Sequence, residues 1–245
     1  MYHDRQLPVL RYRTNVRKGT ETPMEETTKK RGRRAKKDSA LDVIPISTQE
    51  ISKEQNKRIM NAALDVVNKQ TIAGTRMHLI AERAKMVQSN VHYYYKTKNE
   101  LMGALQEYIF EECYDARRKE KKHSKDALES QLDVFINQKK RLILTKHKYD
   151  FAEIDFWVQS KSNDEIHEKF NESYTKWRRE IREVLEKYCP WLDDKSKELL
   201  PYTLVSLLQG ATIQYLINKE AFDVEGYFEQ CKQMMLSQIN SLKTQ

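Results

Sequence analysis

Hydrogen-bonding and basic side chains crowd the segment from residue 88 to residue 98. Four of them can both donate and accept hydrogen bonds: Gln88, Ser89, Asn90 and His92. Four more can donate to phosphate oxygens or attract them by charge: Tyr93, Tyr94, Lys96 and Lys98. Glutamine and asparagine amides can pair in bidentate fashion with the edge of adenine. The segment therefore predicts a surface that reads the bases and holds the backbone of double-stranded DNA.

A short helix before this segment would help to position it. Gly74 can end a preceding helix, and Thr75 can cap the next one. We predict that next helix from about Arg76 to Ala84, because apolar residues recur there at three- and four-residue spacing: Met77, Ile80, Ala81 and Ala84. Thr75 and Arg76, at its start, join the expected DNA contacts.

The reading side chains would lie on a second short helix. Ser89 or Asn90 can cap this helix, which we expect to run from Val91 to Tyr95. Two helices this short are unstable alone in water, so a third must support them. The segment from residue 54 to residue 68 supplies it, with one apolar stripe: Ile59, Ala62, Ala63, Val66 and Val67. The pattern predicts a helix-turn-helix, whose second helix enters the major groove.

At these residues the chain resembles the TetR family of bacterial transcription regulators, over about residues 54 to 104. The positions that match the family signature are Gly74, Thr75, Ile80, Ala81, Ala84, Tyr93, Lys98 and Leu101, with conservative replacements at Met86 and Tyr95. The chain departs from the signature at Lys85, where the family has glycine, and at Val87, where it has serine. Because lysine enters the left-handed backbone region at a cost of roughly 1 kcal/mol, we expect a differently shaped turn here.

Charge and composition divide the chain into three parts. Residues 1–53 carry 13 basic and 7 acidic side chains, residues 54–100 carry 8 and 4, and residues 101–245 carry 23 and 25. The positive field therefore lies in the half that would meet DNA. We predict a disordered basic tail over 1–52, a helix-turn-helix domain over 53–100, and a helical ligand-binding and dimerisation domain over 101–245.

The tail contains seven basic residues within nine: Lys29, Lys30, Arg31, Arg33, Arg34, Lys36 and Lys37. Arg31, Gly32 and Arg33 resemble the core of a minor-groove AT-hook, although Arg34 stands where that motif has proline. Two interpretations remain open, a solvated tail and an arm that adds backbone or minor-groove contacts. We favour the arm because it precedes a DNA-binding unit.

Helical periodicity continues from residue 101 to the end of the chain, so we predict an all-α protein of about nine helices. The segment Leu199–Asn218 is uncharged and apolar on nearly every side. A membrane span is disfavoured because Pro201, Gln209 and Gln214 would be costly in lipid. We instead expect it to form a four-helix interface with residues 223–242 and a second copy of the chain, and the family resemblance implies the same homodimer.

A ligand pocket is expected between the helices of the C-terminal domain. Its predicted lining combines aromatic and polar side chains: Phe151, Glu153, Asp155, Phe156, Trp157, Tyr174, Trp177 and Gln209. Each of them could instead serve only in packing. The carboxylates at 153 and 155 hint at a cationic or donor-rich ligand.

These observations together predict a cytoplasmic homodimer that binds a near-palindromic operator and is released by a small-molecule effector. A non-specific nucleic-acid or nucleoid-binding protein is the alternative, because the basic tail would serve it equally well. An enzyme is disfavoured, since the sequence contains no phosphate-binding loop, metal-ligand set or nucleophile motif. We therefore expect neither a cofactor nor a metal. The N-terminus lacks the apolar core of a signal peptide.

Overall fold

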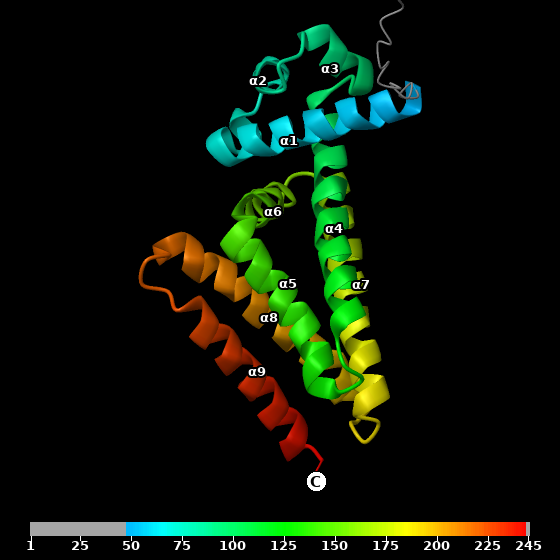
Figure 1. Ribbon diagram of the computed structural model, residues 1–245, viewed down its shortest axis with the longest axis vertical. Coiled ribbons are helices and arrows are strands. Elements are labelled where there is room, and N and C mark those ends of the chain that lie inside the picture. The colour runs from blue at the N-terminus through cyan, green and yellow to red at the C-terminus, as the bar shows by residue number, and fades with distance from the viewer. Residues whose placement is uncertain (1–47, 244–245) are drawn as a thin grey trace, which may run out of the picture. The chain divides into compact units, whose positions relative to one another are not determined.

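The computed structural model describes residues 48–243, which form nine α-helices and no strand (Figure 1). The predicted all-α class is thus confirmed for this part of the chain. The helices are α1 (Thr48–Gly74), α2 (Met77–Arg83), α3 (Gln88–Tyr94), α4 (Lys98–His123), α5 (Leu128–Thr145), α6 (His147–Gln159), α7 (Asp164–Tyr188), α8 (Asp194–Asn218) and α9 (Val224–Ser241). The basic cluster Lys29–Lys37 lies outside the described residues.

The helix-turn-helix is held by one apolar core. The predicted stripe on α1 is buried, and it packs with Ile80 and Ala81 of α2, Val91 of α3, and Leu101 of α4. Because α4 contributes to this core, the helix-turn-helix packs directly against the helix that leads into the C-terminal domain (Figure 1). Helix α1 is longer than predicted at both ends, and it begins at Thr48, inside the range assigned to the tail.

Two predicted helix caps are wrong. The residue that caps α2 is Arg76, while Thr75 is fully buried and its hydroxyl donates to the Thr71 carbonyl at 2.7 Å. Helix α3 begins at Gln88 after Val87, so Ser89 and Asn90 lie within its first turn. Their side chains are exposed and are therefore free to face a ligand.

The turn between α2 and α3 keeps the left-handed step that the glycine of the family signature would supply. Lys85 adopts φ 53°, and its carbonyl accepts a hydrogen bond of 2.9 Å from the Arg58 guanidinium of α1. Our expectation of a differently shaped turn is therefore wrong at this position. The turn accommodates lysine at an energetic cost, because Cβ crowds the backbone in this conformation.

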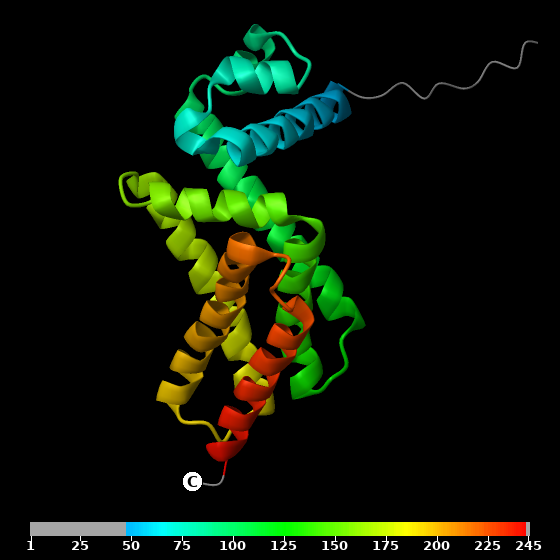
Figure 2. The same ribbon diagram turned by 90° about the vertical axis from the view of Figure 1, so that its left-hand side faces the viewer.

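The C-terminal domain has its own core between α5, α7, α8 and α9. Trp177, Ile181, Val184 and Leu185 form the buried stripe of α7, as their spacing requires. Helices α8 and α9 lie side by side and both face the viewer in Figure 2. Their outer faces expose large apolar side chains: Leu199, Tyr202, Ile213, Leu216, Ile217 and Met234. Within residues 48–243, no helix has the length and hydropathy needed to cross a membrane.

We expect Lys85→Gly to be more stable than Lys85→Ala by roughly 0.5–1 kcal/mol, since glycine relieves the left-handed strain but loses more unfolded-state entropy. The Arg58 hydrogen bond goes to a backbone carbonyl, so both variants can retain it. Urea unfolding followed by circular dichroism measures the difference. Equal stabilities would contradict the strain at this turn.

Candidate DNA-reading surface and effector cavity

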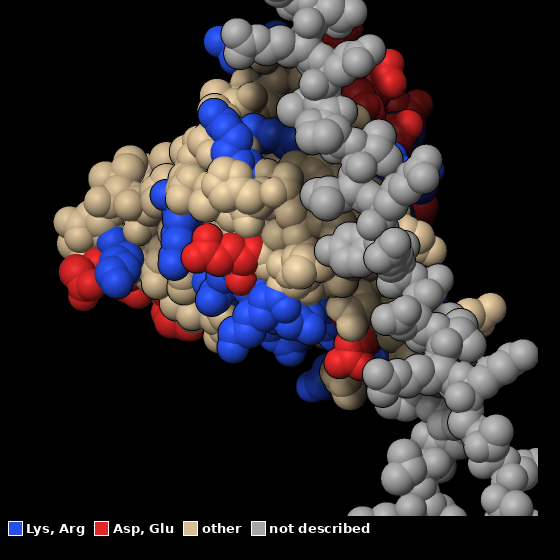
Figure 3. Space-filling view, turned by 90° about the horizontal axis from the view of Figure 1, so that it is seen from above, with Lys and Arg blue, Asp and Glu red and all other residues tan. Residues whose placement is uncertain are grey.

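The N-terminal half of α3 presents polar side chains to solvent. Gln88, Ser89 and Asn90 are exposed, and Tyr93 is 76% exposed. Seen from above, this end of the molecule carries groups of lysine and arginine side chains beside uncharged surface, with some acidic side chains between them (Figure 3). The surface thus combines groups that can bond base edges with charge that can hold phosphates.

Several predicted DNA contacts are engaged within the protein. The Gln88 amide lies 3.2 Å from His92 Nε2, and His92 Nδ1 lies 3.3 Å from the Lys96 carbonyl. Both ring nitrogens are therefore occupied, and His92 holds the end of α3. Tyr94 is half-buried and packs against the first core.

The two residues that we placed at the start of α2 differ in their surroundings. Thr75 is 0% exposed, so its predicted DNA contact through the side chain is corrected. Arg76 is exposed, and its guanidinium donates to the carbonyls of Ala73 and Thr75 at 2.8 and 3.0 Å. Lys98 donates to the Ala73 carbonyl at 3.3 Å, and partial burial, with the Arg76 charge nearby, lowers the pKa of Lys98.

Val87 was not among the residues predicted at this surface. Val87 is 63% exposed, and it lines a hollow with Arg58, Lys85, Asn90 and Tyr93. An exposed apolar group beside reading amides can contact the methyl group of thymine. The sequence feature that could have indicated its exposure is an apolar residue just before a helix, at the N-cap position where a polar residue is preferred.

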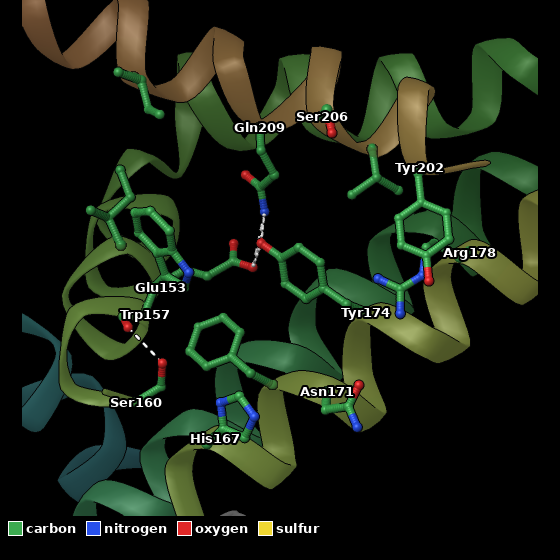
Figure 4. Close-up of a pocket in the computed structure, with 14 residues that line it drawn as sticks. Glu153, Trp157, Ser160, His167, Asn171, Tyr174, Arg178, Tyr202, Ser206 and Gln209 are labelled. Carbon is green, nitrogen blue, oxygen red and sulfur yellow. Dashed lines mark hydrogen bonds between the residues drawn. The ribbon is translucent and has the colours of Figure 1, made fainter. Parts of the chain in front are cut away.

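A cavity of about 440 Å³ lies between α6, α7 and α8 (Figure 4). Its lining includes four residues of the predicted pocket: Glu153, Trp157, Tyr174 and Gln209. Phe170, Arg178, Tyr202 and Val205 complete much of the wall. Its volume, and the aromatic side chains of Trp157, Phe170, Tyr174 and Tyr202 in its wall, are typical of small-molecule sites.

The other four predicted pocket residues lie elsewhere. Phe151 lines a separate hollow beside the end of α8, and Phe156 is buried in the core that α1 and α4 share. Trp177 belongs to the second core, where the Arg117 guanidinium lies 5.3 Å from its ring centre. Asp155 faces α1 instead. Helical periodicity identified apolar and polar faces but could not say which of two cores each face meets.

A buried polar network borders the cavity. Lys139 Nζ of α5 donates to Asp150 Oδ1 of α6 at 2.7 Å and to Gln209 Oε1 of α8 at 2.6 Å. The side chains of Lys139 and Asp150 are 2% and 1% exposed. Gln209 Nε2 then donates to Glu153 Oε1 at 3.1 Å, as does the Tyr174 hydroxyl (Figure 4). The network joins four helices at the floor of the cavity.

Burial and neighbouring charges together shift the pKa values of Lys139 and Glu153, the two ionisable groups that the network joins through Gln209. Burial alone would lower the pKa of Lys139, but the Asp150 and Glu153 carboxylates outweigh it and raise that pKa. Lys139 therefore stays protonated. Burial raises the pKa of Glu153, and Lys139 with the hydrogen bonds from Gln209 and Tyr174 only partly opposes the rise.

Helix α6 also contacts the DNA-binding unit. The Asp155 carboxylate accepts a hydrogen bond from the Ile72 amide in the last turn of α1. The Asn68 side chain donates to the Lys148 carbonyl at 2.9 Å, and Lys148 forms an ion pair with Asp65. One helix thus lines the cavity on one side and holds the DNA-binding unit on the other.

The fold and these surfaces are those of a helix-turn-helix protein with a second, helical domain that contains a cavity. A model of bacterial regulatory proteins of the tetR family matches residues 59–105, and one of the C-terminal domain of BetI-type transcriptional repressors matches residues 152–240. The chain belongs to the TetR family. The protein is therefore a DNA-binding transcription regulator.

Individual relatives resemble the chain at low sequence identity. An HTH-type transcriptional regulator in the dhlA 5' region of Xanthobacter autotrophicus is 23% identical over 177 residues, covering 69% of this chain and 83% of the relative. A Saccharomonospora viridis regulator in complex with choline superimposes with a TM-score of 0.67 at 17% identity, covering 75% of this chain and 96% of that one. For FadR from Bacillus subtilis in complex with stearoyl-CoA, the TM-score is 0.62 at 16% identity, with coverages of 74% and 97%.

We expect Lys139→Met to lower the free energy of unfolding by about 3–5 kcal/mol, because it leaves the Asp150 carboxylate buried without its cation. Lys140→Met is the matched control, since the neighbouring Lys140 pairs with the exposed Glu225 and its loss should cost about 0–1 kcal/mol. Chemical unfolding of both variants measures the difference. Equal losses at the two positions would contradict a structural role for the buried pair.

Proposed function

We propose that the chain is a homodimeric repressor that binds a near-palindromic operator and leaves it when a small molecule fills the cavity between α6, α7 and α8. The observation that carries the proposal is the double attachment of α6. Glu153 and Trp157 on this helix line the cavity, while Asp155 holds the amide of Ile72 in α1. A ligand that shifts α6 therefore acts directly on the DNA-binding unit.

The outer faces of α8 and α9 support the homodimer. In a monomer, these faces leave large apolar side chains in contact with water, including Leu199, Leu216, Ile217 and Met234. Pairing of two copies would remove this apolar surface from water. Pairing these faces in two copies makes a four-helix interface. Two α3 helices related by a twofold axis then reach half-sites separated by one helical turn of DNA, about 34 Å, or a multiple of it.

The switch requires a difference in ligand affinity between two forms of the dimer. A ligand that binds the DNA-incompetent form a hundredfold more tightly supplies roughly 2.7 kcal/mol of coupling. Glu153 favours a cationic group on that ligand, because its carboxylate faces the cavity beside aromatic rings. The choline carried by the Saccharomonospora viridis regulator is a ligand of this kind.

Selection from random duplexes tests the reading surface. With the full chain in moderate salt, we expect enrichment of a near-palindrome. Asn90→Ala should relax the preference at one position of each half-site, with a loss of roughly 1–3 kcal/mol for the cognate base. Tyr93→Phe should weaken binding to all sequences by about fivefold to tenfold, since it removes one hydroxyl contact to phosphate. Flat enrichment would instead favour a non-specific nucleic-acid-binding protein.

The coupling through α6 is tested at Asp155. Asp155→Ala removes the acceptor for the Ile72 amide, so this amide should exchange hydrogen faster. We also expect effector binding, found by thermal-shift screening of the full chain, to release the operator less or not at all in this variant. Asp155→Asn is the matched control, because it retains an acceptor oxygen and should retain release. Full release in Asp155→Ala would remove α6 from the mechanism.

A further inference from the structure

Arg178 differs from the other arginines of the C-terminal domain in having no carboxylate partner among the described residues. The arginines of residues 101–243 that pair with a carboxylate are Arg117, Arg118, Arg141, Arg179 and Arg182. Arg178 lines the cavity, donates to the Thr175 hydroxyl at 3.0 Å, and stacks 4.4 Å from the ring centre of Tyr202. Most of its five N–H donors are left for another partner.

Glu153 is the complementary case in the same cavity. Its carboxylate accepts hydrogen bonds from two neutral groups, the Tyr174 hydroxyl and the Gln209 amide. No lysine or arginine forms an ion pair with it in the described part of the chain. The nearby Lys139 is occupied, since it donates to Asp150 and to Gln209. The Glu153 carboxyl therefore has no cationic group in direct contact, and a bound cation would stabilise its ionised form.

The two unpaired charges do not neutralise each other. Glu153 and Arg178 form no ion pair, and Figure 4 shows them on opposite sides of Tyr174. Glu153 lies beside Trp157 and Gln209, and Arg178 lies beside Tyr202. A ligand with a single charge would satisfy one pole and cover the other without supplying a partner, which costs free energy where the ligand displaces water from that charge.

We propose that the effector is a zwitterion, with a cationic nitrogen bound by Glu153 and a carboxylate bound by the Arg178 guanidinium. A short apolar body would join the two groups and pack on Tyr174 and Tyr202. The cavity of about 440 Å³ accommodates a molecule of this size. The inference deepens the proposed function, and it rests on this cavity being the effector site.

Matched small molecules test the two poles. The zwitterionic probe is γ-trimethylammonio-butanoate, together with its shorter and longer homologues. Its methyl ester keeps only the cation, and the isosteric carboxylate with a tert-butyl group in place of trimethylammonium keeps only the anion. Isothermal titration calorimetry on the full wild-type chain should find that at least one zwitterion binds about tenfold or more tightly than both of its single-charge partners, as expected for a charge-assisted hydrogen bond.

Two substitutions assign the poles. Arg178→Gln should abolish the preference for the zwitterion over its ester while leaving the ester's affinity within about threefold, because the ester does not use the guanidinium. Glu153→Gln should abolish the preference over the tert-butyl carboxylate. Arg179→Gln is the matched control, since Arg179 is the exposed neighbour on α7 and should leave both preferences unchanged. Circular dichroism checks that each variant is folded. The preference of the wild-type chain for the zwitterion is measured without any variant, so it tests the inference even if a variant fails to fold.

Three results would overturn the inference: no binding by any probe in the series, an ester that binds as tightly as its zwitterion, or a preference unchanged in Arg178→Gln. Operator release is measured separately by fluorescence anisotropy. A zwitterion that binds without releasing DNA would leave the site assignment intact and remove the proposed switch. A purely cationic ligand that releases DNA would support the proposed switch and contradict the assignment of a zwitterionic effector.

Discussion

The buried ammonium group of Lys139 constrains the packing of the C-terminal domain. An isolated charge in an apolar interior is prohibitively costly, so Lys139 must be neutralised and hydrogen-bonded where it lies. Asp150 neutralises it and Gln209 accepts its second hydrogen bond, which fixes α6 and α8 against α5. The Asp150 carboxylate also accepts a hydrogen bond of 2.8 Å from the Thr212 hydroxyl. Because these partners satisfy Lys139, the Glu153 carboxylate remains available to a ligand.

The position of Asp150 also explains how α6 contacts both the cavity and the end of α1. Along α6, residues three, four and seven positions apart share a face, so Glu153 and Trp157 follow from the placement of Asp150. Asp155 lies five positions from Asp150, on the far side of the helix, where it meets the end of α1. A shift of α6 within the cavity must therefore displace the Asp155 carboxylate. The connection is short, because no intermediate helix separates the cavity lining from the DNA-binding unit.

Local patterns predicted the helices well, and long-range contacts decided what the patterns could not. The stripe on α1 and the stripe of α7 follow from spacing alone, and both are buried. Thr75 was misassigned because a threonine before a helix can cap it, whereas the fold buries this one. Lys139 had no signal, since a lysine in a polar run is indistinguishable from a solvated one until its partners on α6 and α8 are known. Arg178 was missed for the same reason.

Two residues with strained backbone lie in the helix-turn-helix domain, one in the last turn of α1 and one in the turn after α2. Thr71 adopts φ 61°, and Lys85 adopts φ 53°, although neither is glycine. Positions of this kind cost of order 1–3 kcal/mol each and persist only where their surroundings hold them. Arg58 holds Lys85 from within the domain, whereas the amide that follows Thr71 donates to Asp155 of α6. In the proposed switch, a shift of α6 would therefore act on the last turn of α1 and not on the turn after α2.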